Sequence, residues 1–333
     1  MTLAPKTVLR RLLTATAVPL LALAAVAAGG PAAMAATGTT GSGTTGTGTA
    51  AIGTAGSRGD GGSARPGRYL LSLGDSLGFG YQEQRISAEL AVGGYSPDHF
   101  PGYVQPFASQ LRRVSEHRQT VVNYSCPGET TGSMVTGPCD FAAYVHSLGY
   151  PRALHDDYTG SQLAAAVSFL AAHRNQVSPI TVSLGANDLN DLFNGCAREL
   201  TCVQNGLPGT LARLSSNLGT TLSALRSQAP HAEIIVLTPY NPAYVINPAT
   251  DALLQAGDAA IATVAARTGA RVADGFTAIN LAVPGQEQLS VCTLTLMCGQ
   301  QDIHPSDAGY QRLACALWSA SGYARRDRDR HAA

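Results

Sequence analysis

Residues 68–78 read "RYLLSLGDSLG", an apolar run that leads directly into a glycine-rich turn with one serine, Ser76. The apolar run predicts a β-strand over residues 68–73. Similar runs recur along the chain, so strands are also expected at residues 120–125, 180–184, 232–238 and 270–274. The segment "IIVL" at 234–237 is continuously apolar, as expected when helices cover both faces of a sheet.

Helical patterns separate the predicted strands. Residues 161–175 repeat Leu163, Val167 and Leu170 at helical spacing. Further helices are expected around residues 103–117, 207–228, 250–268 and 306–320. Strands that alternate with helices pair in parallel through right-handed crossovers. The pattern therefore predicts an α/β fold, a three-layer α/β/α sandwich with a mainly parallel five-stranded sheet.

Polar turns that contain glycine or proline follow the first four predicted strands. These turns lie at residues 74–76, 125–129, 185–188 and 239–242. In open parallel sheets, sites form outside the carboxyl ends of the strands, which lie at one edge. We therefore expect the four turns to meet at one site.

The residues of these turns fit nucleophilic catalysis. A serine hydroxyl needs a base within hydrogen-bond reach and donors aimed at the oxyanion that forms on attack. Ser76 supplies the hydroxyl, and His304, in a polar segment just before a predicted helix, is the best base. The backbone N–H groups of Ser76 and Gly128 and the side chain of Asn187 can supply the donors. Taken alone, His304 could be a surface histidine and Asn187 the start of an Asx turn.

Two families of serine hydrolase must be compared. "GDSLG" at 74–78 matches the G-x-S-x-G turn of α/β-hydrolases, in which the nucleophile follows several strands. Here Ser76 comes at the end of the first predicted strand, so we interpret the match to the α/β-hydrolase turn as accidental. "GDSL" at 74–77, the glycine of "CPGETT" at Gly128, "GAND" at 185–188 and "DIHP" at 302–305 together resemble the four blocks of the SGNH (GDSL) hydrolases, in the same order.

The resemblance spans residues 68–320 and comes closest to secreted actinobacterial GDSL lipases and esterases. It implies a flavodoxin-like sandwich that works without a metal or other cofactor. By resemblance, Ser76 is the nucleophile, His304 the base, and Ser76, Gly128 and Asn187 form the oxyanion hole. Asp75 is then expected to support the nucleophile turn and Asp188 to be structural.

One block departs from the family pattern. The family usually places its acid three residues before the histidine, and that position holds Gln301 here. Asp302 lies only two residues before His304. Either Asp302 orients the imidazole from a shifted loop, or a main-chain carbonyl, most simply that of Gln301, does so and leaves a Ser–His dyad. Because of this spacing, we favour the main-chain carbonyl as the group that orients the imidazole.

The N-terminal sequence indicates export. A basic start, an apolar stretch and "AMA" at 33–35 predict a signal peptide over residues 1–35, although a retained anchor would share some of these features. The Thr/Gly/Ser-rich residues 36–67 predict a flexible linker. The catalytic domain is expected at 68–322 and a charged, solvated tail at 323–333. We therefore expect a secreted protein with no membrane span after processing.

Seven cysteines become informative in an oxidising compartment. Six of them form pairs that are close in sequence, which favours disulfides Cys126–Cys139, Cys196–Cys202 and Cys292–Cys298. Six cysteines nevertheless allow 15 pairings. The sequence contains no C-x-x-C pair, which argues against a zinc site. Cys315 lies in the apolar pattern "QRLACALW" and is expected to be a buried free thiol.

Composition limits the partners. The net formal charge is zero, which argues against nucleic acid as the main partner. We expect a monomeric serine esterase or lipase that hydrolyses lipid or fatty-acyl esters. The alternative substrate is an acetylated polysaccharide, which the same site could deacetylate. A peptidase, or a non-catalytic exported binding module, is a further alternative.

Overall fold

The structure is a computed structural model that describes residues 66–115, 117–324 and 327. The predicted signal peptide, almost all of the predicted linker and most of the predicted tail lie outside these residues. Within the described residues, no helix is long and apolar enough to cross a membrane.

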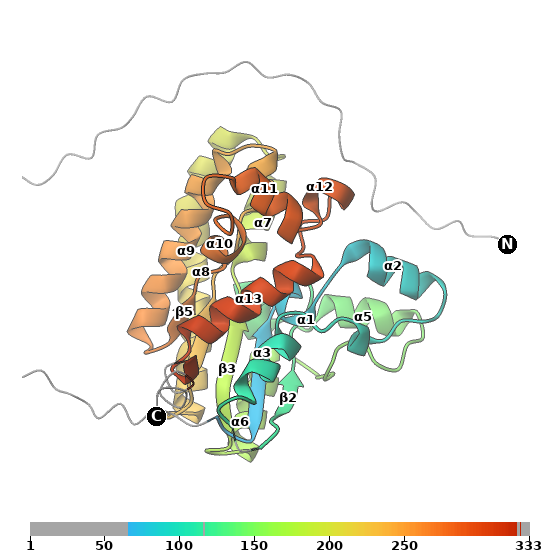
Figure 1. Ribbon diagram of the computed structural model, residues 1–333, viewed down its shortest axis with the longest axis vertical. Helices are drawn as coiled ribbons and strands as arrows, with labels where there is room; N and C mark the ends of the chain where they lie inside the picture. Colours follow the sequence, from blue (N-terminus) through green and yellow to red (C-terminus); the bar gives the residue numbers. More distant parts are fainter. Residues whose placement is uncertain (1–65, 116, 325–326, 328–333) are drawn as a thin grey trace, which may run out of the picture. The chain divides into compact units, whose positions relative to one another are not determined.

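Five parallel strands form one sheet in the order β2-β1-β3-β4-β5 (Figure 1). Each overlaps a strand expected from the sequence: β1 (Tyr69–Gly74), β2 (Thr120–Asn123), β3 (Val177–Ser183), β4 (Ile234–Leu237) and β5 (Arg271–Ala273). The predicted parallel α/β sandwich is confirmed. The chain reverses its direction of winding between β1 and β3, and in doubly wound sheets such a point marks the ligand site.

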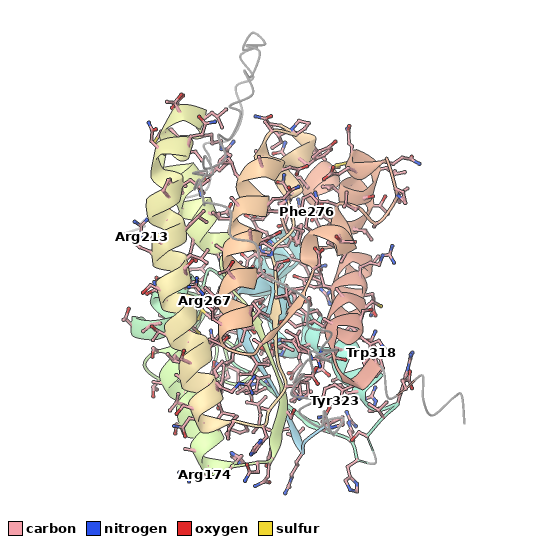
Figure 2. All side chains as sticks on the ribbon, turned by 90° about the vertical axis from the view of Figure 1, so that its left-hand side faces the viewer. Arg174, Arg213, Arg267, Phe276, Trp318 and Tyr323 are labelled. Carbon is pink, nitrogen blue, oxygen red and sulfur yellow. A yellow bond between two sulfur atoms is a disulfide. The ribbon has the colours of Figure 1, made fainter. Side chains whose placement is uncertain are left out.

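One face of the sheet is covered by four helices. They are α4 (Thr131–Thr136), α6 (Gln162–Ala172), α8 (Leu200–Gln228) and α9 (Thr250–Arg267). Leu214, Leu218 and Leu222 of α8 recur every four residues and are fully buried against this face. The long helices α8 and α9 lie side by side along the molecule (Figure 2).

The other face is covered by α3 (Val104–Leu111), α10 (Gly275–Ile279) and α13 (Asp307–Ala320). Tyr103, Phe107 and Leu313 are fully buried in this layer. Tyr323 is also fully buried, and its hydroxyl lies 2.8 Å from Ser178 Oγ. The packed structure thus continues to at least Ala324, beyond the domain end expected at residue 322.

A third, smaller core lies beside the carboxyl ends of β1 and β2. It contains α2 (Glu83–Ala91), the short η1 (Pro97–His99) and α5 (Asp140–Ser147), which lie to the right of the sheet in Figure 1. Phe79 and Phe100 pack together in its centre with ring centroids 6.1 Å apart. The sequence analysis assigned none of these helices, because they are short and their apolar periodicity is weak.

Three disulfides join the cysteine pairs that the sequence spacing favoured. The Cα atoms are 5.9 Å apart in Cys126–Cys139, 5.6 Å in Cys196–Cys202 and 5.1 Å in Cys292–Cys298. All three distances suit a disulfide.

The prediction that Cys315 is buried is wrong, because the side chain is exposed. Helix α13 turns Leu313, Ala314 and Leu317 toward the core, and Cys315 lies on its outer surface, where Gln110 Nε2 is 3.5 Å from the sulfur. Gln311, Arg312 and Ser319 lie on the same side of α13 as Cys315 and are exposed, so the helical spacing of these polar residues is the signal that could have placed Cys315 outside the core.

The remaining helices lie around the carboxyl edge of the sheet. They are α1 (Ser76–Phe79), α7 (Ala186–Gly195), η2 (Pro242–Val245), α11 (Glu287–Leu294) and α12 (Met297–Gln300).

Candidate active site

The turn after β1 places Ser76 at the start of α1. Gly74 has a φ of +122°, and a Cβ atom there would lie 2.0 Å from the Ser183 carbonyl oxygen, so this position requires glycine. Asp75 caps α1: its Oδ1 accepts the Leu77 N–H at 3.0 Å and the Ser183 hydroxyl at 2.9 Å. The backbone and its neighbours therefore fix the position of the serine.

Asp75 is buried beneath this turn, with only 1% of its surface exposed. Burial raises the pKa of Asp75 to about 6, although the hydrogen bonds from Leu77 and Ser183 and the charge of His304 limit the rise. One of the Asp75 hydrogen bonds lies within the turn and the other joins the turn to Ser183 of β3, which fits the supporting role expected for this residue.

His304 meets Ser76 across 228 positions of sequence. The Nε2 atom of His304 lies 3.0 Å from Ser76 Oγ, which is within the range for proton transfer. The His304 loop is held between α12 and α13 by a bridge that pairs Thr295 with Pro305. Ser306 then caps α13 by accepting the Gly309 N–H at 3.3 Å.

Asp302 lies on the other side of the imidazole. Its Oδ1 is 2.5 Å from His304 Nδ1 and also accepts the His304 backbone N–H at 3.0 Å. The Oδ2 atom accepts the Glu83 N–H, at the start of α2, at 2.8 Å. Burial alone would raise the pKa of Asp302, but the hydrogen bond and charge of His304 and the Glu83 N–H lower it below its usual value.

The short spacing between Asp302 and His304 is accommodated by the backbone. Gln301 ends α12 with a φ of +57°, in the left-handed region, and this turns the chain just before Asp302. In the described residues the hydrogen-bond partner of His304 Nδ1 is the Asp302 carboxylate, and the Gln301 carbonyl has no such contact. The geometry thus differs from the main-chain arrangement that the spacing favoured.

The two residues just before α2 contact this loop in ways that the sequence analysis missed. Gln82 Nε2 donates to the Pro305 carbonyl at 3.2 Å and to Asp307 Oδ1 at 3.1 Å. The ring of Tyr81 lies 4.7 Å from the His304 imidazole, centroid to centroid. No local pattern around Gln82 indicated contacts with residues more than 220 positions away.

Gly128 lies in the turn after β2, and Asn187 lies in the first turn of α7, which follows β3. Asn187 Nδ2 donates to the Glu129 carbonyl at 2.9 Å, and Gly128 has a φ of +85°. Asp188 accepts the backbone N–H of Thr131 at 2.9 Å, which fits the structural role expected for it. The structure therefore joins the turn that carries Gly128 to the start of α7, which carries Asn187, by a hydrogen bond.

A cavity of about 140 Å³ opens beside Ser76, Asn187 and His304. Its wall is mainly apolar and comes from α7, the first turns of α8, η2 and the first turns of α9. Large apolar side chains from these elements in it include Leu189, Leu192, Phe193, Val203, Leu207, Leu253 and Leu254. The sequence analysis did not assign α7, although the i, i+3, i+4 spacing of Leu189, Leu192 and Phe193 is the signal that could have found it.

The arrangement suits acyl transfer. A hydroxyl, an imidazole and a carboxylate lie in one hydrogen-bonded line, as a base-activated serine requires. In the part of the chain that the structure describes, no group of three His, Cys, Asp or Glu side chains is arranged to hold a metal ion.

Solved structures share this fold at low sequence identity. The lipase Lip_vut3 from a goat rumen metagenome is 15% identical, with a TM-score of 0.50 over 76% of this chain and 96% of its own. A GDSL-like lipase from Parabacteroides merdae ATCC 43184 is 14% identical, with a TM-score of 0.50 over 78% of this chain and 97% of its own. Axe2, an acetylxylan esterase from Geobacillus stearothermophilus, is 18% identical, with a TM-score of 0.47 over 77% and 94%.

No curated protein matches the sequence. The sequence model of the GDSL-like Lipase/Acylhydrolase family matches residues 72–312, which include Ser76, Gly128, Asn187 and His304. This match covers most of the chain and agrees with the order of the four blocks and with the parallel sheet. The protein therefore belongs to the GDSL-like lipase/acylhydrolase family.

Proposed function

We propose that this protein is an exported serine esterase that hydrolyses fatty-acyl esters through a covalent acyl-enzyme on Ser76. The observation that carries the proposal is the 3.0 Å approach of His304 Nε2 to Ser76 Oγ at the edge of an apolar cavity. The three disulfides and the N-terminal sequence support export, because disulfides persist in oxidising compartments.

The residues have separate tasks in the proposed reaction. His304 takes the proton of Ser76 as its oxygen attacks the ester carbonyl carbon, and then gives it to the leaving alcohol. Asp302 holds the imidazole by its Nδ1–H and stabilises the imidazolium that forms. The N–H groups of Ser76 and Gly128 and the Asn187 amide stabilise the oxyanion. Water then attacks the acyl-enzyme by the same steps and releases the acid.

The cavity supports a fatty-acyl rather than an acetyl substrate. An acetyl group carries one methyl and would leave most of the apolar wall uncovered. Each methylene that a longer acyl chain buries is worth about 0.8 kcal/mol, or about a fourfold gain in binding. The leucines and Phe193 of α7, α8 and α9 provide the surface on which such a chain can be buried.

A series of p-nitrophenyl esters from acetate to palmitate tests the substrate class. We expect kcat/KM to rise by about fourfold per methylene from acetate until the cavity is filled. If kcat/KM is highest for acetate and falls with each added methylene, the fatty-acyl proposal is wrong and deacetylation of a polysaccharide becomes the better assignment.

Leu253→Trp tests whether the cavity holds the acyl chain. The larger side chain should reduce kcat/KM for long esters more than for acetate and so move the optimum to shorter chains. Val92→Trp is the matched control, because Val92 is 81% exposed and outside the cavity. An unchanged chain-length profile in Leu253→Trp would place the acyl chain elsewhere.

A further inference from the structure

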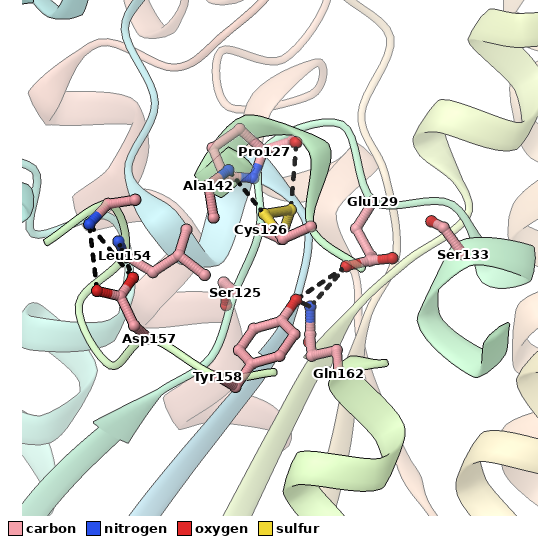
Figure 3. Close-up of a disulfide and its surroundings, with 12 residues drawn as sticks. Ser125, Cys126, Pro127, Glu129, Ser133, Ala142, Leu154, Asp157, Tyr158 and Gln162 are labelled. Carbon is pink, nitrogen blue, oxygen red and sulfur yellow. Dashed lines mark hydrogen bonds between the residues drawn. A yellow bond between two sulfur atoms is a disulfide. The ribbon is translucent and has the colours of Figure 1, made fainter. Parts of the chain in front are cut away.

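A buried hydrogen-bond network lies next to the candidate oxyanion donors, and Figure 3 shows its part around Glu129, Tyr158 and Gln162. Gln162, at the start of α6, is fully buried and bonds to both backbone groups of Gly74. Its Oε1 accepts the Gly74 N–H at 2.5 Å, and its Nε2 donates to the Gly74 carbonyl at 3.0 Å. The same Nε2 lies 3.0 Å from Glu129 Oε2, so Gln162 joins the end of β1 to the turn after β2.

Glu129 is an unusual residue for this position. It is 2% exposed, and its Oε2 accepts from Gln162 and, at 3.3 Å, from the Tyr158 hydroxyl. Within the described residues its other oxygen, Oε1, is buried without a hydrogen-bond partner. Such burial opposes the ionised form of the carboxyl group, so stability alone does not explain a glutamate here.

The network joins all three candidate oxyanion donors. Gly74 lies two residues before Ser76, Glu129 directly follows Gly128, and the Glu129 carbonyl accepts the Asn187 side chain at 2.9 Å. We propose that Glu129 is a positioning residue, whose side chain sets the distance of Gly128 and Asn187 from Ser76 through Gln162. This inference rests on the proposed esterase function.

Other contacts fix the same turn only in part. The Cys126 N–H donates to the Gly74 carbonyl at 2.9 Å and holds the beginning of the turn to β1. Asp188 holds Thr131, on the far side of the turn, to α7 rather than to β1. The Glu129 N–H also donates to the Cys126 carbonyl at 3.1 Å, within the turn. The Glu129 side chain adds a direct side-chain link, through Gln162, between the Gly128 end of the turn and the end of β1.

Kinetics of Glu129→Ala on the preferred p-nitrophenyl ester test this role. Loss of an oxyanion donor typically costs 10²–10³ in rate, so a displaced one should lower kcat by about 10- to 100-fold. KM should change by less than about threefold, because the donors act on the transition state and not on the bound ester. Glu129→Gln keeps an acceptor for Gln162 and Tyr158 and should retain kcat within about threefold.

A matched control separates this effect from the general loss of a buried acid. Asp258, on α9, is a half-buried carboxyl whose Oδ1 has no hydrogen-bond partner among the residues that the structure describes, and it does not line the cavity. Asp258→Asn should leave kcat unchanged. The double variant Glu129→Ala/Gln162→Ala should lose less kcat than the product of the losses in the two single variants. Both substitutions break the same link, so their effects on kcat should not multiply.

The pH dependence of stability gives a readout that does not depend on activity. Burial raises the pKa of Glu129 to about 7 from its ordinary 4.5, while nearby Ser133 and the hydrogen bonds from Gln162 and Tyr158 lower it and nearby Asp75 raises it further. Between these two pH values the folded protein binds more protons at this site than the unfolded chain, so stability falls as pH rises. Tm should therefore fall less steeply from pH 5 to 7.5 in Glu129→Gln than in the wild type.

The outcomes separate this inference from the proposed function. Wild-type protein that hydrolyses no ester overturns both. Suppose instead that the wild type is active. The positioning role alone is then overturned if Glu129→Ala keeps kcat within threefold of the wild type, or if Glu129→Gln loses as much kcat as Glu129→Ala. A loss of kcat in Glu129→Ala that Glu129→Gln restores, with KM maintained, supports it.

Discussion

Ser76→Ala is expected to lower kcat for ester hydrolysis by about 10⁶-fold, the scale of loss when a nucleophilic serine is removed from a catalytic triad. Alanine has no hydroxyl to form the acyl-enzyme, and His304, 3.0 Å away in the wild type, loses the group that it activates. Steady-state kinetics on a p-nitrophenyl ester, with the release of p-nitrophenolate followed by absorbance, measure this loss.

The exposed Ser109 of α3 provides the control. Ser109→Ala should hydrolyse the ester at the wild-type rate. A Ser76→Ala protein that keeps more than one hundredth of the wild-type kcat would show that hydrolysis does not pass through this serine.

Asp302→Asn is expected to lower kcat by about 10⁴-fold, as when the acid of a catalytic triad is changed to its amide. The carboxylate accepts both the His304 Nδ1–H and the His304 backbone N–H, and it is held by the Glu83 N–H at the start of α2. Asparagine has the same shape, but its amide favours the wrong imidazole tautomer and cannot stabilise the imidazolium by charge.

This substitution also decides between the two arrangements that the sequence left open. A loss of less than about tenfold would contradict the role of Asp302 and favour a Ser–His dyad oriented by the Gln301 carbonyl. Asp140→Asn, at the exposed start of α5, is the control and should have wild-type kinetics.

The fold could be predicted from the sequence because its information is local. Each buried strand is an apolar run, and "IIVL" at 234–237 sits in the sheet with all four residues buried. The turns that carry Ser76, Gly128 and Asn187 follow these strands directly. Parallel pairing then brings the turns to one edge without any knowledge of the long-range contacts.

The rest of the site depends on contacts that no local pattern encodes. Asp302 reaches His304 because Gln301 adopts a left-handed conformation and because the Glu83 N–H, 219 positions away, donates a hydrogen bond to the Asp302 carboxylate. Gln82 and Gln162 are isolated polar residues whose roles are set by backbone groups brought near them in the folded state. For Cys315 the error was one of orientation, because the prediction followed its apolar neighbours in sequence and not the polar Gln311, Arg312 and Ser319 that share its side of the helix.

The most direct test of the central claim is to treat the purified full-length protein with a fluorophosphonate and locate the modification by mass spectrometry. A serine activated by His304 attacks the phosphorus, displaces fluoride and retains the phosphonyl group, whereas an ordinary serine does not. We expect one modified residue, Ser76, and no modification in His304→Ala. Intact protein that stays unmodified at Ser76, or that reacts at another serine, would contradict the account.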